Sequence, residues 1–157
     1  ILAAEQAQDF TEKQLFVVPT KTIPQGIATL LAFDPEADGQ TNFEAMSQSY
    51  GDVLTGNITY AVRDTEFDGQ SIHEGNILGL AEGTIACCGE DLKDTTVTLI
   101  EKLLTQKNDL ITLYYGSDTT QEDAEEIAAI INEKYPSTDV EVISGGQPVY
   151  YYIISIE

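Results

Sequence analysis

The spacing of apolar residues predicts mainly helices before about residue 55, strands over residues 56–89, and helices that alternate with strands after that. Residues 1–10 and the stretch that begins near Pro24 have helical periodicity, whereas Leu15–Val18 is a short apolar, partly β-branched run typical of a buried strand. Proline is favoured in the first turn of a helix, where its missing N–H costs nothing. The order helix, strand, loop, helix predicts part of an α/β layer.

A further helical stretch follows the break at Asp34-Pro35. Phe43, Met46 and Tyr50 recur at i, i+3 and i+7, which places them on one face of a helix. A methionine at such a position is more typical of packing than of a cofactor contact. We therefore expect this helix to pack against its neighbours.

Residues 56–89 have the pattern of an antiparallel meander. From Ile58 to Arg63 the residues alternate with the period of a half-exposed strand. Asp68-Gly69 is a turn signal, and Glu82-Gly83 stands between two β runs, which predicts a hairpin. The meander is expected to be a separate antiparallel unit.

The last third of the chain predicts helices that alternate with strands. Thr119 and Glu122 have the spacing of a capping box before the second of these helices. A strand–helix–strand of this length favours a right-handed parallel crossover. The expected elements are a helix from Asp91, a strand Leu110–Tyr115, a helix with an apolar stripe from Ala124 to Tyr135, a strand Val140–Ile143, a turn at Gly145-Gly146 and a final strand Val149–Ile156.

Together these patterns predict a mixed α/β protein with two lobes. Residues 1–55 form a partial N-terminal strand–helix lobe, and residues 56–157 form a second lobe with a mixed sheet. The chain begins within a helical pattern that has no capping residue, so we expect residue 1 to be a cut within a longer protein.

The net charge of the chain limits the classes of partner that it is expected to bind. Seven Lys and Arg against 27 Asp and Glu give a net charge of −20. Such a surface repels nucleic acid and anionic membranes, so neither is an expected partner. Apolar runs are too short to cross a bilayer. Two interpretations of the charge remain open, a surface that favours solubility and a docking surface for a basic partner.

The sequence contains little that is typical of catalysis. There is no phosphate-binding or dinucleotide-binding glycine motif, and the single histidine, His73, lies in an expected turn. Cys87 and Cys88 are neighbours in an expected strand and should point to opposite faces, so we predict packing rather than a disulfide or a metal site. Reduced thiols suit a cytoplasmic protein. We predict no catalytic residues, no metal and no cofactor in this chain.

The stretch "PTKTIPQG" is the strongest candidate for a binding site. It follows an expected strand and precedes a helix, the position at which α/β folds bind ligands. Thr20, Thr22 and Gln25 offer hydroxyls and an amide, Lys21 offers a cation, and the N–H groups of the helix suit a carboxylate or phosphate. Arg63, one of the few other basic residues, is a further candidate for contact with a ligand or partner.

A structural explanation of the same stretch stays open beside the binding one. Thr22 can serve as the cap of the helix, Pro24 can set its first turn, and Gly26 can allow close packing. Lys21 can be tied to a nearby carboxylate instead of contacting an anion or a partner.

Three segments resemble the C-terminal region of the A-type subunit of bacterial fatty acid kinase, the dihydroxyacetone-kinase-like proteins of the YloV type. They occur in order and extend nearly from end to end, which is more specific than any single motif. The segments are "VVPTKTIPQGIATLLAFDPEAD", "GNITYAVRDTEFDGQSIHEGNILGLAEGTI" and "GGQPVYYYIISIE".

This resemblance implies a context for the chain. The family's ATP and magnesium residues belong to an N-terminal kinase domain and its metal-binding features to a middle domain, both outside this sequence. In that family a separate DegV-like subunit carries a fatty acid, the kinase phosphorylates it, and the acyl phosphate serves phospholipid synthesis. The C-terminal domain is implied to have a two-lobed fold similar to that of the DegV-like subunit, which it docks. No family motif assigns a catalytic residue here.

Two hypotheses of different classes follow from the sequence. In the first, the chain is an acidic docking domain, not catalytic alone, that binds the acyl-carrying DegV-like subunit. In the second, it binds a small carboxylate or phosphate through the loop Thr20–Gln25. The net charge favours the first hypothesis, and the strand–loop–helix junction permits the second.

Overall fold

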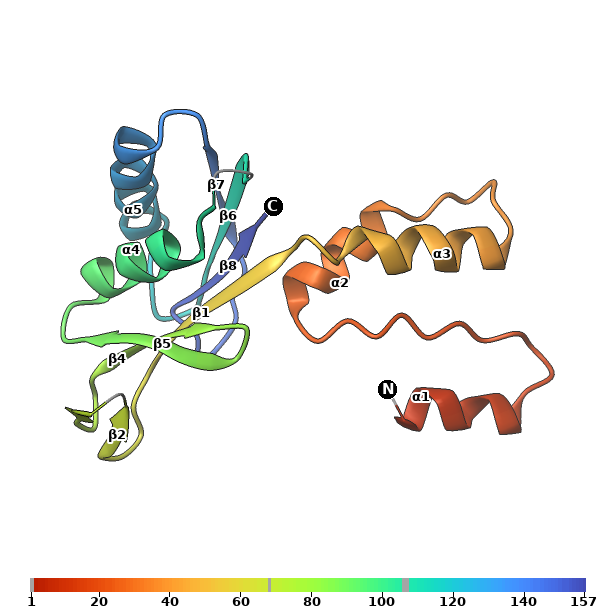
Figure 1. Ribbon diagram of the computed structural model, residues 1–157, viewed down its shortest axis with the longest axis horizontal. Coiled ribbons are helices and arrows are strands. Elements are labelled where there is room, and N and C mark those ends of the chain that lie inside the picture. The colour runs from red at the N-terminus through yellow and green to blue at the C-terminus, as the bar shows by residue number, and fades with distance from the viewer. Residues whose placement is uncertain (1, 68, 106–107) are drawn as a thin grey trace. The chain divides into compact units, whose positions relative to one another are not determined.

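The computed structural model describes residues 2–67, 69–105 and 108–157 (Figure 1). The chain forms two compact units, Ile1–Val53 and Leu54–Glu157. The fold is mixed α/β, as the sequence predicts.

The first unit is helical over its described residues. Its packing centres on helices α2 and α3, and the ring of Phe16 stacks on Phe43 of α3 with centroids 5.5 Å apart. The buried Asn42 side chain ties α3 to the preceding turn, accepting from the Asp34 N–H at 2.8 Å and donating to the Asp34 carbonyl at 2.8 Å. The elements are α1 (Leu2–Gln6), a 3-10 helix (Ala7–Phe10), α2 (Ile23–Leu31) and α3 (Gly39–Ser49).

The predicted strand Leu15–Val18 is wrong. A strand needs a neighbour for its backbone groups, and the described part of the first unit contains no strand that could supply one. Instead, the Leu15 N–H donates to the side chain of Gln8 at 2.9 Å, and Phe16 is held by its stacking on Phe43. Phe16 thus has an apolar contact although the segment forms no ladder.

The second unit is built on a six-stranded mixed sheet in the order β5-β4-β1-β8-β6-β7 (Figure 1). A small hairpin, β2–β3, stands beside it as a separate two-stranded sheet. The strands are β1 (Leu54–Tyr60), β2 (Thr65–Phe67), β3 (Gln70–Ile72), β4 (Ile77–Ala81), β5 (Thr84–Gly89), β6 (Leu110–Tyr115), β7 (Asp139–Ser144) and β8 (Tyr152–Ile156).

The predicted meander exists but is not a separate unit. β1, β4 and β5 are antiparallel neighbours, and the β4–β5 hairpin turns at Glu82-Gly83, where φ is +48° and +80°. However, β8 pairs with β1 on one side and β6 on the other, so the meander continues into the same sheet. The other predicted turn is Asp68-Gly69, and its first residue, Asp68, lies outside the described residues.

The parallel crossover is confirmed, with two corrections at its ends. β6 and β7 are parallel, and α5 (Gln121–Lys134) connects them. The capping box is formed by Thr120 and Asp123 rather than by Thr119 and Glu122, because the Thr119 hydroxyl faces the Gly116 and Tyr151 carbonyls instead. β8 begins at Tyr152, since Val149 has a φ of +73° and cannot continue a strand.

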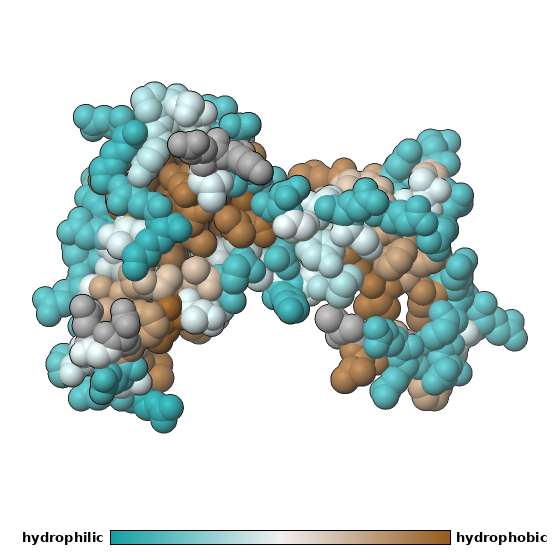
Figure 2. Space-filling model, in the orientation of Figure 1, coloured by the Kyte–Doolittle hydropathy of each residue, from teal (hydrophilic) through white to brown (hydrophobic). Residues whose placement is uncertain are grey.

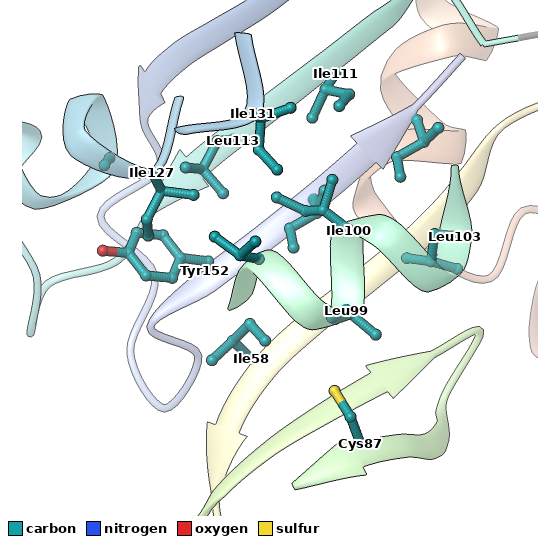
Figure 3. Close-up of a cluster of buried hydrophobic side chains, with 14 of the residues drawn as sticks. Ile58, Cys87, Leu99, Ile100, Leu103, Ile111, Leu113, Ile127, Ile131 and Tyr152 are labelled. Carbon is teal, nitrogen blue, oxygen red and sulfur yellow. The ribbon is translucent and has the colours of Figure 1, made fainter. Parts of the chain in front are cut away.

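Helices α4 (Leu92–Leu103) and α5 pack on the same sheet and enclose the core (Figures 1 and 3). Isoleucines and leucines of both helices meet those of β1, β6 and β8. Burying such a side chain contributes about 1.5–3 kcal/mol. The largest fully buried members are Tyr152, Ile58, Leu99, Ile100, Ile111, Leu113, Ile127, Ile131, Ile154 and Ile156.

Gly116, which directly follows β6, is closely packed against the backbone of the segment that precedes β8. A Cβ added there would overlap the Tyr150 carbonyl oxygen and lie 2.8 Å from that of Gln147. We predict that Gly116→Ala lowers the free energy of unfolding by about 1–3 kcal/mol, because backbone must shift to admit a methyl group. Guanidinium unfolding followed by circular dichroism measures this, and an unchanged stability would contradict the packing described.

Candidate functional site

The candidate loop of the first unit is held together by its own polar groups. Thr22 is the N-cap of α2, and its hydroxyl oxygen accepts from the Gln25 N–H at 3.3 Å. In return the Gln25 side-chain oxygen accepts from the Lys21 N–H at 3.0 Å. Thr22 therefore caps the helix, as the structural explanation anticipated, and Gln25, predicted only as a contact residue, also shapes the loop.

The first turn of α2 offers little to an anion. Pro24 has no N–H, and the N–H groups of Gln25 and Gly26 already donate within the turn. At most the Ile23 N–H remains of the donors that make helix N-termini attractive to phosphate or carboxylate. This geometry weakens the small-ligand hypothesis for the loop.

Lys21 and Arg63 are exposed but belong to different parts of the chain. Lys21 lies in the loop, and among residues 2–53 no carboxylate oxygen lies within 4.0 Å of its ammonium group. Thr20, half-buried, precedes it. Arg63 lies in the second unit, in the bend after β1, so it is not part of this loop.

Gly26 does not serve close packing in the structure. No atom lies within 4 Å of a Cβ built at this position, apart from its chain neighbours and its own helix. Glycine within a helix costs about 0.5–1 kcal/mol relative to alanine. Gly26 therefore leaves α2 less stable than it could be, with no compensating contact among the described residues.

We predict that Gly26→Ala stabilises α2 by about 0.5–1 kcal/mol. Because the gain is local, the amide hydrogens of α2 should exchange more slowly in the variant, and those of the second unit should not change. Faster exchange in α2 would show that the glycine is needed there.

A pocket that sequence reasoning missed lies in the second unit, where α4 and α5 both begin. β1, β5 and β6 run in the same direction, so the carboxyl ends of β5 and β6 meet at one edge of the sheet. Each of those two strands leads into a helix there. The pocket, of about 220 Å³, is lined by Asp91, Leu92, Lys93, Asp118, Thr119, Asp123, Ile127 and Tyr152.

Tyr152 is the unusual member of this pocket. Its side chain is fully buried, and its hydroxyl has no hydrogen-bond partner among the described residues. Figure 3 shows the hydroxyl oxygen at the end of the ring that points away from the core residues Leu113 and Ile100. Burial raises the pKa of Tyr152 to about 12, and the charge of Asp123 adds to the rise. The neighbouring Thr119 side chain acts in the opposite direction and lowers the pKa of Tyr152, although the hydroxyls of Thr119 and Tyr152 are not in hydrogen-bond geometry.

The raised pKa of Tyr152 gives a pH-dependent prediction. The folded protein keeps the phenol proton up to about pH 12, whereas an unfolded tyrosine loses it near pH 10. The stability that Tyr152 contributes is therefore complete below about pH 10 and is lost as the pH rises through about 12. We predict that Tyr152→Phe gains stability relative to the wild type over this range. Urea unfolding of both proteins at several pH values measures the difference, and a constant difference would contradict the assignment.

Acidic residues outnumber basic ones on α5, whereas α4 carries two of each, and Figure 2 shows hydrophilic side chains over this side of the second unit. In α5 five of the 14 residues are Asp or Glu and one is Lys. Two lysines are engaged between the helices, Lys93 with Glu126 and Lys134 with Glu101, the latter at 2.7 Å. The hydrogen bonds of these carboxylates raise the pKa of both lysines. Carboxylates beyond these pairs leave the helical surface negative.

The remaining candidates from the sequence show no assembled chemistry among the described residues. His73 is exposed, with Nδ1 3.7 Å from the carboxylate of Asp64. Cys87 and Cys88 are free thiols on opposite faces of β5, and burial raises the pKa of Cys87. Within the described residues no three His, Cys, Asp or Glu side chains are grouped to hold a metal ion, and no described helix is long and apolar enough to span a membrane.

Comparison with known families gives a match over the whole chain. The FakA-like C-terminal family, which describes the C-terminal part of fatty acid kinase A-type subunits and similar proteins, matches residues 1–157. Protein YloV of Bacillus subtilis is 38% identical over 157 residues, which are 100% of this chain and 28% of that protein. An uncharacterized protein of Staphylococcus aureus is 37% identical over the same length, which is 29% of that protein. The chain thus spans less than a third of these relatives.

Solved structures show the same fold in DegV family proteins. Cg2579 from Corynebacterium glutamicum superposes with a TM-score of 0.62 at 12% identity, covering 99% of this chain and 68% of that one. A DegV family protein from Ruminococcus gnavus, solved with vaccenic acid, gives a TM-score of 0.58 at 14% identity, with coverage of 99% and 65%. The predicted DegV-like fold is therefore confirmed.

Proposed function

Since the chain belongs to the FakA-like C-terminal family, we propose that it is the docking domain of a fatty acid kinase. Its partner is an acyl-carrying protein of the DegV family, which presents a fatty acid to a kinase domain outside this chain. The chain performs no phosphoryl transfer alone, and ATP and magnesium bind elsewhere in the longer protein. The acyl phosphate formed enters phospholipid synthesis in the cytoplasm.

The observation that carries this proposal is the one-sided charge. The net charge is −20, and the α4–α5 layer presents carboxylates in excess of its paired lysines. Opposite charges on two proteins speed their encounter and fix their orientation. A solubility role would favour the same composition, but membership of a kinase-subunit family favours a specific partner, and the charge of the chain suits a basic one.

The identity of the partner rests on the comparisons. A DegV family neighbour was solved with a fatty acid, which makes proteins of that family candidate carriers. The chain shares their fold at 12–14% identity, which supports a common architecture. In this proposal the docking domain and the carrier share a fold, but the carrier binds the fatty acid and the docking domain binds the carrier.

The loop Thr20–Gln25 supports the alternative proposal, a small-ligand site, less well. Thr22 and Gln25 are engaged in capping, and α2 retains at most one first-turn donor. Lys21 remains suited to contact a partner, because its charged side chain is exposed.

Charge reversal on α5 tests the proposal. We predict that Glu122→Lys with Glu125→Lys weakens binding to a fatty-acid-loaded DegV family protein on the order of tenfold at low salt. The control pair Glu36→Lys with Glu44→Lys changes the net charge equally on the first unit and should have a smaller effect. Calorimetric titration at two salt concentrations measures both. Equal losses in the two pairs would indicate a general charge effect and would contradict docking through α5.

Lys21→Ala separates a contact from a structural role in the loop. We predict reduced affinity for the DegV family protein at an unchanged melting temperature, since Lys21 is exposed and has no ion-pair partner among residues 2–53. The affinity is measured at high salt, where the general attraction between an acidic chain and a basic partner is screened and the loss of one positive charge does not strengthen it. Affinity and melting temperature are measured on the same sample. A lower melting temperature with full affinity would assign Lys21 to the loop's own stability instead.

A further inference from the structure

The pocket between the beginnings of α4 and α5 has the position of a ligand site. In open α/β sheets, ligands bind outside the carboxyl ends of the strands, and here the ends of β5 and β6 lead into the two helices at one edge. The amino end of antiparallel β8 reaches the same edge and supplies Tyr152. The pocket volume of about 220 Å³ suits the end of a side chain more than a large cofactor.

The buried and unpaired hydroxyl of Tyr152 indicates that the pocket binds a ligand group. Its side chain has 0% exposure, it lines the pocket, and it has no hydrogen-bond partner within the described residues. Leaving such a group unpaired costs about 1–3 kcal/mol. Phenylalanine would fill the same space without this cost, so the hydroxyl is unexplained by the packing of the core. A guest with a hydrogen-bonding group would satisfy it.

The charges around the pocket indicate whether a bound group is positive or negative. Asp91 caps α4 by accepting from the Asp94 N–H at 2.8 Å, and Asp123 accepts from Thr120 in the capping box of α5. These carboxylates offset the positive ends of their own helices. Lys93 is paired with Glu126, and Asp118 adds a further exposed negative charge. The sum is negative, which opposes phosphate or carboxylate and favours a cation.

We propose that this pocket receives an arginine side chain of a basic protein partner. Its guanidinium donates to the Tyr152 hydroxyl oxygen and to the carboxylate of Asp118. Arginine fits better than lysine because its planar head carries five donors and is weakly hydrated, so it can enter between Leu92 and Ile127. The inference rests on the proposed docking function and assigns a specific contact to it.

The test uses a side-chain analogue and an uncharged isostere on the intact chain. N-acetyl-arginine amide is titrated by nuclear magnetic resonance, with N-acetyl-citrulline amide as its neutral match. We expect saturable shifts at Leu92, Lys93 and Thr119 with the arginine compound, at a Kd on the order of millimolar for a single side chain. The citrulline compound should bind at least threefold more weakly.

Variants locate the binding. Tyr152→Phe and Asp118→Asn should each weaken the arginine compound at least threefold. The controls Tyr150→Phe and Asp139→Asn, which remove equivalent groups from exposed positions outside the pocket, should not. The amide spectrum of each variant verifies that it is folded.

Three results would overturn the inference: no saturable shift at the pocket, equal binding of arginine and citrulline compounds, or saturable binding of inorganic phosphate in their place. The outcome is distinct from that of the docking proposal. If the DegV family protein binds wild type and Tyr152→Phe equally, docking stands and the arginine contact falls. If the arginine compound binds but the DegV family protein does not, the pocket stands and the docking proposal falls.

Discussion

The second unit depends on the pairing of β8 between β1 and β6. β8 is the last strand in the sequence, yet all five of its residues are buried, and it forms antiparallel ladders on both sides. Without it the meander β1-β4-β5 and the crossover β6-α5-β7 would be two small sheets, neither with a complete core. The last strand is therefore what converts two local motifs into one unit.

This pairing also builds the pocket. Because β8 runs against both neighbours, β1 and β6 run in the same direction, and α4 and α5 begin at the same edge of the sheet. Tyr152, the first residue of β8, is carried to the same place. An aromatic ring at this point closes the core, while its buried hydroxyl has no hydrogen-bond partner among the described residues and belongs to a residue that lines the pocket.

Local patterns in the sequence predict the elements well and their long-range pairing poorly. Leu110–Tyr115 and the Glu82-Gly83 hairpin follow from residue type and period, and the structure confirms both. The prediction of a strand at Leu15–Val18 is wrong because a strand must pair with a second strand, and the pattern of four residues does not show whether one is present. Joining of the meander to β6 could not be foreseen, since it depends on β8, which is distant from β1 in the sequence. Of the candidate site, the capping role of Thr22 is visible in the sequence, whereas the pocket arises only when three distant segments meet.

Docking of an acyl-carrying DegV family protein is the central claim, and hydrogen exchange in the presence of that protein tests it most directly. We expect slower exchange of amides in α4 and α5 when the fatty-acid-loaded protein is added, with the change reduced at high salt. Unchanged exchange throughout the chain, with the fatty-acid-loaded protein in large excess, would contradict the claim.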